Sequence, residues 1–358
     1  MKIKLSVVLI TSLVLVILMS SLASLTACTS KTTPTTTTAP SPTTPLPTFE
    51  LKFLDQYTPQ QAAAQQSELL GKLIEEATGG RVKFTYYHAE SLGKAAEFVN
   101  LLNGGVTDVV NITPGNFPTQ FEVESYVNIP GVGINSRASG VEVLWALYDK
   151  GYLTGLKNYK VLAFNPTPTM NIWLKKKVTT VDGLKGLKIR GGDAQARKML
   201  DLVGAVGTSM PSSEVYMGLD RGTLDGTMTA DEQVVGNKFY EVVKYGIYEP
   251  KTLIGCVFII MTQATWNKLP KDVQDMVDKG IVKNKTAFVD SVKDPDAQYQ
   301  VTLKQNGMDL YSFSAEETAK LFAAAVPLKK DWITAQTAKG VKAQEIADLV
   351  ASIVAKYK

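Results

Sequence analysis

One arginine stands where its side chain could bind an anion. Arg190 ends a predicted strand at 187–190 and is followed by Gly191 and Gly192, so the backbone can turn sharply beside it. A guanidinium at such a turn offers two parallel N–H donors, which match a carboxylate in geometry and charge. The commoner role of an arginine is a surface ion pair with a nearby acid. The residues alone leave both roles open.

The rest of the residue census argues against an enzyme. His88 is the only histidine, which excludes His-rich zinc sites and leaves most Ser-His or Cys-His catalysis dependent on one residue. The glycine pair after Arg190 lacks the further glycine and the Lys-Ser/Thr of a phosphate-binding loop. Adjacent acids such as Asp231 and Glu232 point in different directions, so we interpret them as solvated charges. We assign no catalytic residue, no cofactor and no metal ligand.

The first thirty residues have the layout of a secretory signal. The chain begins Met-Lys-Ile-Lys, and residues 5–25 are almost unbroken apolar sequence. Residues 25–28, Leu-Thr-Ala-Cys, resemble a bacterial lipobox, and by that resemblance 1–27 is removed and Cys28 carries lipid. The alternative is an uncleaved transmembrane helix, since the apolar run is long enough to span a bilayer. We favour the lipobox because small residues precede a cysteine that has no other evident role.

A spacer follows the signal. Residues 29–48 are nearly all Thr, Pro, Ser and Ala, which offer too little apolar surface to offset the entropy of ordering. We therefore predict a lipidated, extended tether at 28–48 that anchors the folded part to the membrane. Without the two N-terminal lysines, 36 basic residues face 34 acidic ones, and no basic run indicates a nucleic-acid partner. Cys256 lies in an apolar run and is predicted to be a buried strand thiol.

From residue 49 the chain alternates short strands with amphipathic helices. Polar and apolar residues alternate over 50–54, as in a half-buried strand, and 59–77 carries apolar residues at helical spacing. The same reasoning predicts strands at 82–87, 108–112, 159–164 and 187–190, and helices at 97–102, 193–202 and 212–220. Short loops between such elements favour parallel α/β layers. Ser314 to Glu317 has the pattern of a capping box, and Pro327 is expected to begin or kink a long helical segment.

A series of short motifs runs through the folded part in a fixed order. They are 78–82, 91–94, 181–190 (Val-Asp-Gly-Leu-Lys-Gly-Leu-Lys-Ile-Arg), 202–205, 210–216 (Met-Pro-Ser-Ser-Glu-Val-Tyr), 219–222, 224–226, 238–242 and 266–270. Together they resemble the solute-binding proteins of TRAP transporters, the tripartite ATP-independent periplasmic transporters. One such motif alone is weak, whereas this many in order are specific.

The resemblance implies an α/β, two-lobed periplasmic-binding-protein-like fold, with a ligand cleft between the lobes and a long C-terminal helical segment. We expect lobe I to comprise about 49–168 and 252–292, and lobe II about 169–251 and 293–358. In the family the arginine of the Leu-Lys-Ile-Arg motif clamps the ligand carboxylate, which assigns that role to Arg190. The chain is thus expected to be an extracytoplasmic, non-enzymatic subunit. It would capture a small organic carboxylate by lobe closure and deliver it to TRAP membrane permease subunits.

Two positions depart from the family pattern, and both make the pocket less polar. Met170 stands where the family often has a second arginine, and Thr-Met-Thr at 227–229 replaces an acid followed by a ligand-holding asparagine. An apolar or aromatic monocarboxylate is therefore favoured over a sugar acid or dicarboxylate, although Met and Trp at such positions can equally be core residues. The candidate ligand-binding residues are Arg190, Asn171, Trp173, Met170, Thr229 and Asn111.

Three other functions remain open on the sequence. The first is the solute-binding lipoprotein of an ATP-driven importer, which would share the two lobes but not this run of motifs. The second is a lipid-anchored enzyme, which would need a nucleophile or an acid/base pair converging in the cleft. The third is a purely structural or adhesive lipoprotein, which would show no ligand in a closed cleft.

Overall fold

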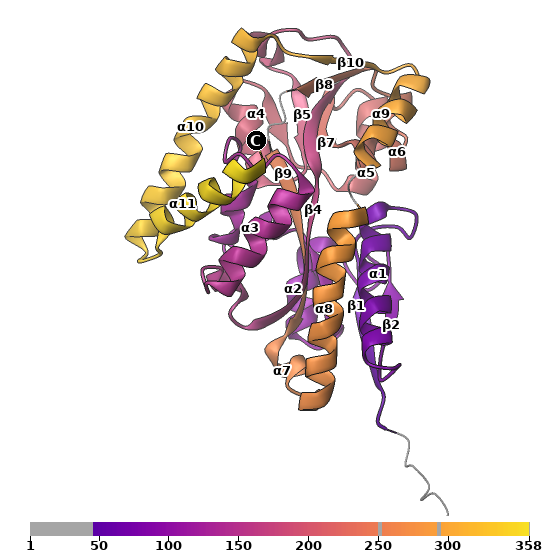
Figure 1. Cartoon of the computed structure of the whole chain (residues 1–358). Coiled ribbons are helices and arrows are strands. Elements are labelled where there is room, and N and C mark those ends of the chain that lie inside the picture. Colours follow the sequence, from indigo (N-terminus) through magenta and orange to yellow (C-terminus); the bar gives the residue numbers. More distant parts are fainter. Residues whose placement is uncertain (1–45, 250–252, 292–294, 358) are drawn as a thin grey trace, which may run out of the picture. The chain divides into compact units, whose positions relative to one another are not determined.

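The structure, a computed structural model, describes residues 46–249, 253–291 and 295–357. The predicted signal, Cys28 and most of the tether therefore lie outside the described residues. From residue 46 onward, strands and helices alternate along the chain as the sequence predicted, and the described strands form one ten-stranded sheet (Figure 1).

The secondary structure follows the predicted order. The strands are β1 (Phe49–Leu54), β2 (Val82–Tyr87), β3 (Val109–Ile112), β4 (Tyr159–Leu174), β5 (Lys188–Gly191), β6 (Val206–Thr208), β7 (Gly226–Ala230), β8 (Tyr245–Glu249), β9 (Leu253–Thr262) and β10 (Asp309–Ser312). The helices are α1 (Ala62–Ala77), α2 (Phe98–Asn103), α3 (Arg137–Asp149), α4 (Ala194–Leu202), α5 (Ser212–Asp220), α6 (Asp231–Gly236), α7 (Gln263–Trp266), α8 (Lys271–Ser291), α9 (Pro295–Gln305), α10 (Ala315–Ala338) and α11 (Ala343–Val354).

The sheet contains two groups of parallel strands that run in opposite directions. β1 pairs in parallel with β2 and β3, and β5 pairs in parallel with β6 and β7. The antiparallel strands β9 and β4 lie between the two groups, so β1 and β3 run opposite to β5 and β7. The carboxyl ends of the two groups therefore face each other across the middle of β4. In open α/β sheets, ligands bind beside the carboxyl ends of parallel strands.

β4 is the strand that connects the two groups. Its first part pairs with β9, and its last residues pair with β7 and β8. The sequence predicted a strand only over 159–164, because Pro166 and Pro168 lack the N–H that a central strand needs. The structure accommodates them by a shift of register between Pro166 and Thr169, after which the strand continues.

Each half of the sheet is covered on both faces. In the β1–β3 half, Val110 and Ile112 pack with α2, α3 and α11, whereas Phe53 and Val109 pack with α1 and α8. In the β5–β7 half, α4 and α10 cover one face, and α5, α6 and α9 cover the other (Figure 1). Cys256 is fully buried in the apolar cluster that contains Val110 and Ile112, which confirms the predicted core thiol. Burial raises the pKa of this thiol.

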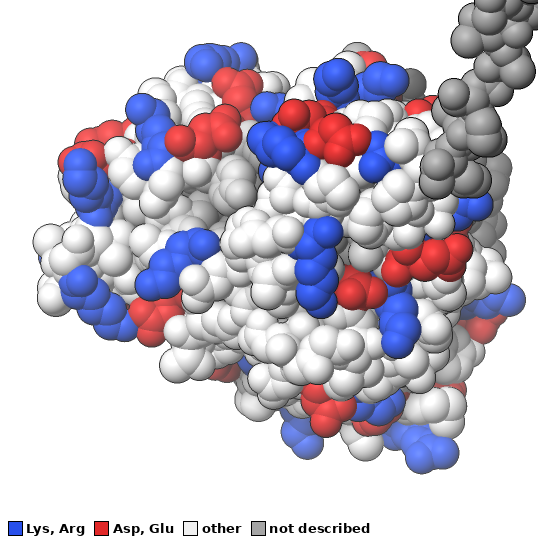
Figure 2. Space-filling view, turned by 90° about the horizontal axis from the view of Figure 1, so that it is seen from below, with Lys and Arg blue, Asp and Glu red and all other residues white. Residues whose placement is uncertain are grey.

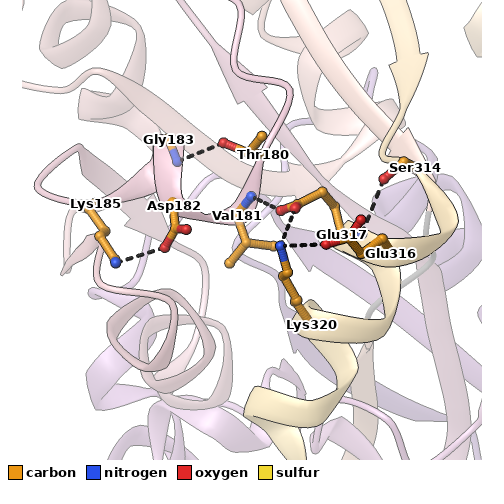
Figure 3. A network of polar contacts seen from close by, with 9 residues as sticks. All are labelled: Thr180, Val181, Asp182, Gly183, Lys185, Ser314, Glu316, Glu317 and Lys320. Atoms are coloured by element: carbon orange, nitrogen blue, oxygen red, sulfur yellow. Dashed lines mark hydrogen bonds and ion pairs between the residues drawn. The ribbon is translucent and has the colours of Figure 1, made fainter.

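The helix α10 starts where the sequence predicted, but its capping box is only half formed. Ser314 Oγ accepts a 3.2 Å hydrogen bond from the backbone N–H of Glu317. The Glu317 carboxylate turns away from Ser314; it accepts a 2.6 Å bond from the N–H of Val181 and pairs with Lys320 at 2.7 Å (Figure 3). Pro327 lies inside this long helix, so of the two expectations, that it begins or kinks the helical segment, the first is wrong.

The surface carries both signs of charge. On the face shown in Figure 2, Lys and Arg are interspersed with Asp and Glu, and no patch of a single sign dominates that face. None of the helices in the described ranges is long and apolar enough to cross a bilayer.

Candidate ligand-binding site

Arg190 lies near the end of β5, where the carboxyl ends of the two strand groups face each other. Its Nε donates a 3.1 Å hydrogen bond to the carbonyl oxygen of Met210. Within the described part of the chain, no carboxylate forms an ion pair with its guanidinium. The two Nη groups can therefore bind an anion from outside the protein in the bidentate geometry that arginine favours.

The electrostatics of Arg190 favour an anionic partner. Burial lowers its pKa to about 10, against the opposing effect of Asp193 nearby. That value lies well above neutral pH, so the guanidinium keeps its positive charge. A half-buried charge without a counter-ion is unfavourable, and a bound anion relieves that cost.

The two glycines after Arg190 are required by close packing. A Cβ at Gly191 would lie 2.8 Å from the backbone nitrogen of Arg197, and one at Gly192 would lie 3.2 Å from Nη1 of Arg190. The methyl carbon of Met170 also lies 4.0 Å from that Gly192 position. Neither glycine has a positive φ, so their role is to leave room, Gly191 for the backbone of Arg197 and Gly192 for the guanidinium of Arg190.

Asp193 connects the two halves of the sheet at this point. Its Oδ1 accepts a 2.8 Å hydrogen bond from the N–H of Ala196 and so caps α4, and burial raises its pKa. Asn128 donates a long 3.5 Å bond to the other carboxylate oxygen. A Cβ at Gly115 would lie only 2.8 Å from Asp193 Cβ. The loop after β3 therefore packs directly against the start of α4.

Asn171 and Thr229 share the sheet face of Arg190. They are register partners across β4 and β7, and Arg190 is the register partner of Thr227, two residues before Thr229. Asn171 Nδ2 donates a 2.7 Å hydrogen bond to Asp231, whose other oxygen accepts a 2.6 Å bond from the Tyr248 hydroxyl. Asn171 Oδ1 is buried without a hydrogen-bond partner among the described residues, so it can accept a bond from a ligand.

Trp173 shares that face but is buried in the core, whereas Met170 lies on the opposite face. Trp173 is fully buried in the cluster with Val215, and its indole donates a 2.9 Å hydrogen bond to the carbonyl of Thr229. This places Trp173 among the core residues, the alternative that the sequence left open. Met170 belongs to the apolar cluster of the opposite face, with α4 and α10, although its methyl group approaches Gly192.

Asn111 is far from Arg190 in the sheet. It lies on β3, and the strands β9, β4 and β7 separate β3 from β5. Asn111 is fully buried, and its Nδ2 donates a 2.9 Å hydrogen bond to Ser67 of α1. Its side-chain contact is therefore with the helix that covers the β1–β3 half.

The sequence did not single out as site residues Tyr57 and Asp193, which lie near Arg190, or Asp231, which contacts Asn171. Tyr57, in the loop after β1, lies close enough to Arg190 to affect its pKa. Asp193 lies two residues after the end of β5, and Asp231 follows β7 directly. All three come after the carboxyl end of a strand in a parallel group, and this positional rule could have found them.

The interpretation of Asp231 and Glu232 as solvated charges is wrong. Asp231 is 2% exposed, and the Glu232 side chain is 9% exposed and forms an ion pair with Arg137 at 3.5 Å. Their partners come from distant segments, which the local sequence cannot show. Among the described residues, no three His, Cys, Asp or Glu side chains gather closely enough to hold a metal ion.

Comparison with known proteins gives consistent matches. The family model described as "Bacterial extracellular solute-binding protein, family 7" matches residues 54–335. The monocarboxylate 2-oxoacid-binding periplasmic protein of Nostoc sp. (strain PCC 7120) is 24% identical over 266 residues, which cover 70% of each chain. The C4-dicarboxylate-binding periplasmic protein of Rhodobacter capsulatus is 25% identical over 314 residues, covering 82% of this chain and 90% of that one.

The fold also matches solved structures. A TRAP solute-binding protein from a marine metagenome, specific for aromatic acid ligands and crystallised with metahydroxyphenylacetate, superposes with a TM-score of 0.80. The two are 23% identical, and the match covers 87% of this chain and 99% of that one. This likeness establishes the expected α/β periplasmic-binding-protein-like fold with its long C-terminal helix α10.

Proposed function

Because the chain belongs to the bacterial extracellular solute-binding proteins of family 7, the solute-binding subunits of TRAP transporters, we propose that it captures a small organic monocarboxylate on Arg190. It is an extracytoplasmic binding protein and not an enzyme. The observation that carries the ligand assignment is the Arg190 guanidinium, which is charged, half-buried and without a carboxylate partner in the described residues. Because this family serves TRAP transporters, membership in it excludes the alternative function as the solute-binding protein of an ATP-driven importer.

The proposed ligand is a carboxylate with an apolar or aromatic body. The relatives above are named for binding a monocarboxylate 2-oxoacid, C4-dicarboxylates and aromatic acids, which share the carboxylate group. Met170 packs in the cluster on the opposite face, and it supports the apolar body only through its methyl group, which lies 4.0 Å from the position of a Cβ at Gly192. Trp173 gives no such support, since its indole lies in the core. Asn171 and Thr229 remain proposed polar contacts on the Arg190 face.

The proposed mechanism is closure of two lobes on the solute. We propose lobe I at about 49–168 and 252–292 and lobe II at about 169–251 and 293–358, with α11 of the second range packing against the core of the β1–β3 half. The opposed directions of the two parallel groups support this division, with β4 passing from one to the other. Closure would remove water from the pair formed by Arg190 and the carboxylate, which strengthens the pair.

Delivery to the membrane completes the proposal. We assign Cys28 as the lipid attachment site, residues 28–48 as the tether, and TRAP membrane permease subunits as the partners. The lipobox-like sequence and the Thr/Pro-rich composition support the anchor. Mass spectrometry of the mature N-terminus tests it: a diacylated or triacylated Cys28 is expected, and an unmodified chain that begins elsewhere would refute the lipid anchor.

A thermal-shift screen tests the ligand assignment. The chain from residue 46 onward, which contains the whole sheet, is unfolded and refolded to remove copurified solute and then titrated with 3-hydroxyphenylacetate, benzoate, pyruvate, succinate and gluconate. At a hundred times the dissociation constant a ligand adds about 2.7 kcal/mol of stability. We expect the largest shift with an aromatic or apolar monocarboxylate.

Two variants of Arg190 test whether the thermal shift depends on its guanidinium. Arg190→Ala removes the guanidinium and is expected to abolish the shift while the ligand-free protein stays folded. Arg190→Lys keeps a positive charge but loses the bidentate geometry, so it should bind weakly. Wild-type affinity in Arg190→Ala would refute the assignment, and a stronger response to succinate or gluconate would refute the apolar ligand class.

A further inference from the structure

An ion pair joins helices that belong to different halves of the sheet. Arg137 Nη2 lies 3.5 Å from Glu232 Oε2, and the two side chains are 6% and 9% exposed. Arg137 is the first residue of α3, whose apolar face packs in the cluster of β3 and α11. Glu232 lies in the first turn of α6, directly after β7, and α6 packs with α5 and α9.

The helix α3, which begins at Arg137, packs directly against the middle of β4. A Cβ at Gly140 would lie 2.8 Å from Cγ of Pro166, so α3 and β4 are in direct contact there. Pro166 marks the beginning of the register shift at which β4 passes from one half to the other. Arg137, one turn before Gly140, therefore stands beside the boundary between the halves.

Three consecutive residues around Glu232 make contacts with both halves of the sheet. Asp231 accepts hydrogen bonds from Asn171 and Tyr248, which belong to β4 and β8 of its own half. Glu232 pairs with Arg137, and Gln233 accepts a 3.5 Å bond from Gln61 at the start of α1. Glu232 and Gln233 thus contact the other half, while Asp231 fixes the same turn to the strand of Asn171.

We propose that Arg137 and Glu232 are positioning residues that latch the two halves in the solute-binding arrangement and thereby set solute affinity without touching the solute. The proposal rests on the proposed function, because the latch acts on the site around Arg190. A buried charge is unfavourable once its partner is removed, so the pair contributes only while the two helices are together. The latch favours the arrangement that binds solute, and so raises the apparent affinity.

The latch is tested by Glu232→Gln, which removes the charge but preserves the shape of the side chain. Solute affinity is measured by calorimetry, the dissociation rate by stopped-flow fluorescence, and the radius of gyration by small-angle X-ray scattering with and without solute. We expect affinity to fall about tenfold, mainly through faster dissociation. We also expect the solute-free protein to have a larger radius of gyration than the wild type.

Controls separate a latch from a general loss of stability. Glu241→Gln removes an exposed acid of the same half that binds Tyr216, and it should leave affinity and scattering unchanged. The double variant Arg137→Gln/Glu232→Gln neutralises both charges of the pair and, together with the two single variants, measures their coupling; strictly additive effects on affinity would contradict the latch. If Glu232→Gln fails to fold, Glu232→Asp, which keeps the charge but shortens the reach, takes its place.

The outcomes distinguish this proposal from the proposed function. Wild-type affinity and scattering in Glu232→Gln, with binding lost in Arg190→Ala, would overturn the latch and leave the solute site standing. Retained binding in Arg190→Ala would overturn the solute site. The scattering of the solute-free protein needs no ligand, so an unchanged radius of gyration contradicts the latch even if no acid binds.

Discussion

The Glu124 carboxylate accepts a 2.8 Å hydrogen bond on Oε1 from the backbone N–H of Gly155, while its Oε2 is buried without a hydrogen-bond partner among the described residues. Gly155 leaves no room for a larger residue, since a Cβ there would lie 2.8 Å from the same Oε2. Burial raises the pKa of Glu124 to about 7. Part of this acid is therefore protonated at neutral pH.

The buried Glu124 predicts that stability falls as the pH rises through the neutral range. Its pKa is about 7 in the folded protein and 4.5 ordinarily, so between these values the folded state binds more protons. The contribution is fully present below pH 4.5 and is lost as the pH rises through about 7, by about 3 kcal/mol. Urea unfolding at pH 5 and pH 8 should show this loss in the wild type and less of it in Glu124→Gln.

Two other acids, Asp55 and Glu142, determine how the pH dependence of Glu124→Gln is interpreted. Burial also raises the pKa of Asp55, to about 6, so some pH dependence of the same sign should remain in Glu124→Gln. Glu142 is the matched control, because its hydrogen bond from Tyr357 lowers its pKa. An identical pH dependence in Glu124→Gln and Glu142→Gln would contradict the prediction.

Gly192 is predicted to control solute affinity more than stability. In Gly192→Ala the new Cβ would lie 3.2 Å from Nη1 of Arg190 and must displace the guanidinium. A small misplacement of a binding group is costly, so we expect affinity for the solute to fall about tenfold in calorimetric titration. Gly236→Ala is the control, because its Cβ would meet only Gln61 Cγ, at 3.8 Å. Equal affinities in the two variants would disprove the role of Gly192.

The hydroxyl of Tyr248 is predicted to stabilise the Asp231 turn. Tyr248→Phe removes a 2.6 Å hydrogen bond to a buried carboxylate, and the unfolding free energy should fall by about 1–2 kcal/mol. Tyr216→Phe removes a 2.7 Å bond between a hydroxyl and an exposed glutamate, Glu241, so its cost should be much smaller. Chemical unfolding of both variants measures the difference, and a larger cost for Tyr216→Phe would count against this assignment.

Glu317 is predicted to attach α10 to the segment before β5. Glu317→Ala removes the 2.6 Å hydrogen bond from Val181 and leaves that N–H without its partner (Figure 3). The expected loss is about 1–2 kcal/mol of unfolding free energy. Its neighbour Glu316 is 78% exposed and, among the residues that the structure describes, pairs with Lys320 alone, so Glu316→Ala should cost about 0.5 kcal/mol or less. Similar urea midpoints for the two variants would rule out the attachment.

Elements with a strong local pattern could be predicted from the sequence. The predicted strand at 82–87 and helix at 212–220 agree with β2 and α5 at both ends. The second part of β4 could not be predicted, because Pro166 and Pro168 argue against a strand and only the pairing with β7 and β8 continues it. Residues 59–61 were assigned to a helix that begins at Ala62, since boundaries depend on backbone geometry that composition does not determine.

Some residues of the candidate site could likewise be predicted from the sequence, and others could not. Arg190 could be identified because a long motif and a glycine pair surround it in the sequence. Trp173 lies in the part of β4 that was not predicted and shares its face with Asn171; its indole is in the core because the helices α5 and α6 cover that part of the face, which the sequence near Trp173 does not show. The burial of Asp231 depends on Asn171 and Tyr248, and neither contact leaves a signal near Asp231 in the sequence.

The apolar cluster around α3 contains residues from Leu54 to Val354 along the chain, and Ile346, Val350 and Ile353 of α11 belong to it. The β1–β3 half therefore cannot complete its core until the last helix has been synthesised. Contacts between segments so far apart in sequence form slowly, because long loops must close first. We therefore expect a chain still attached to the ribosome to lack a finished core, which favours passage across a membrane in the unfolded state.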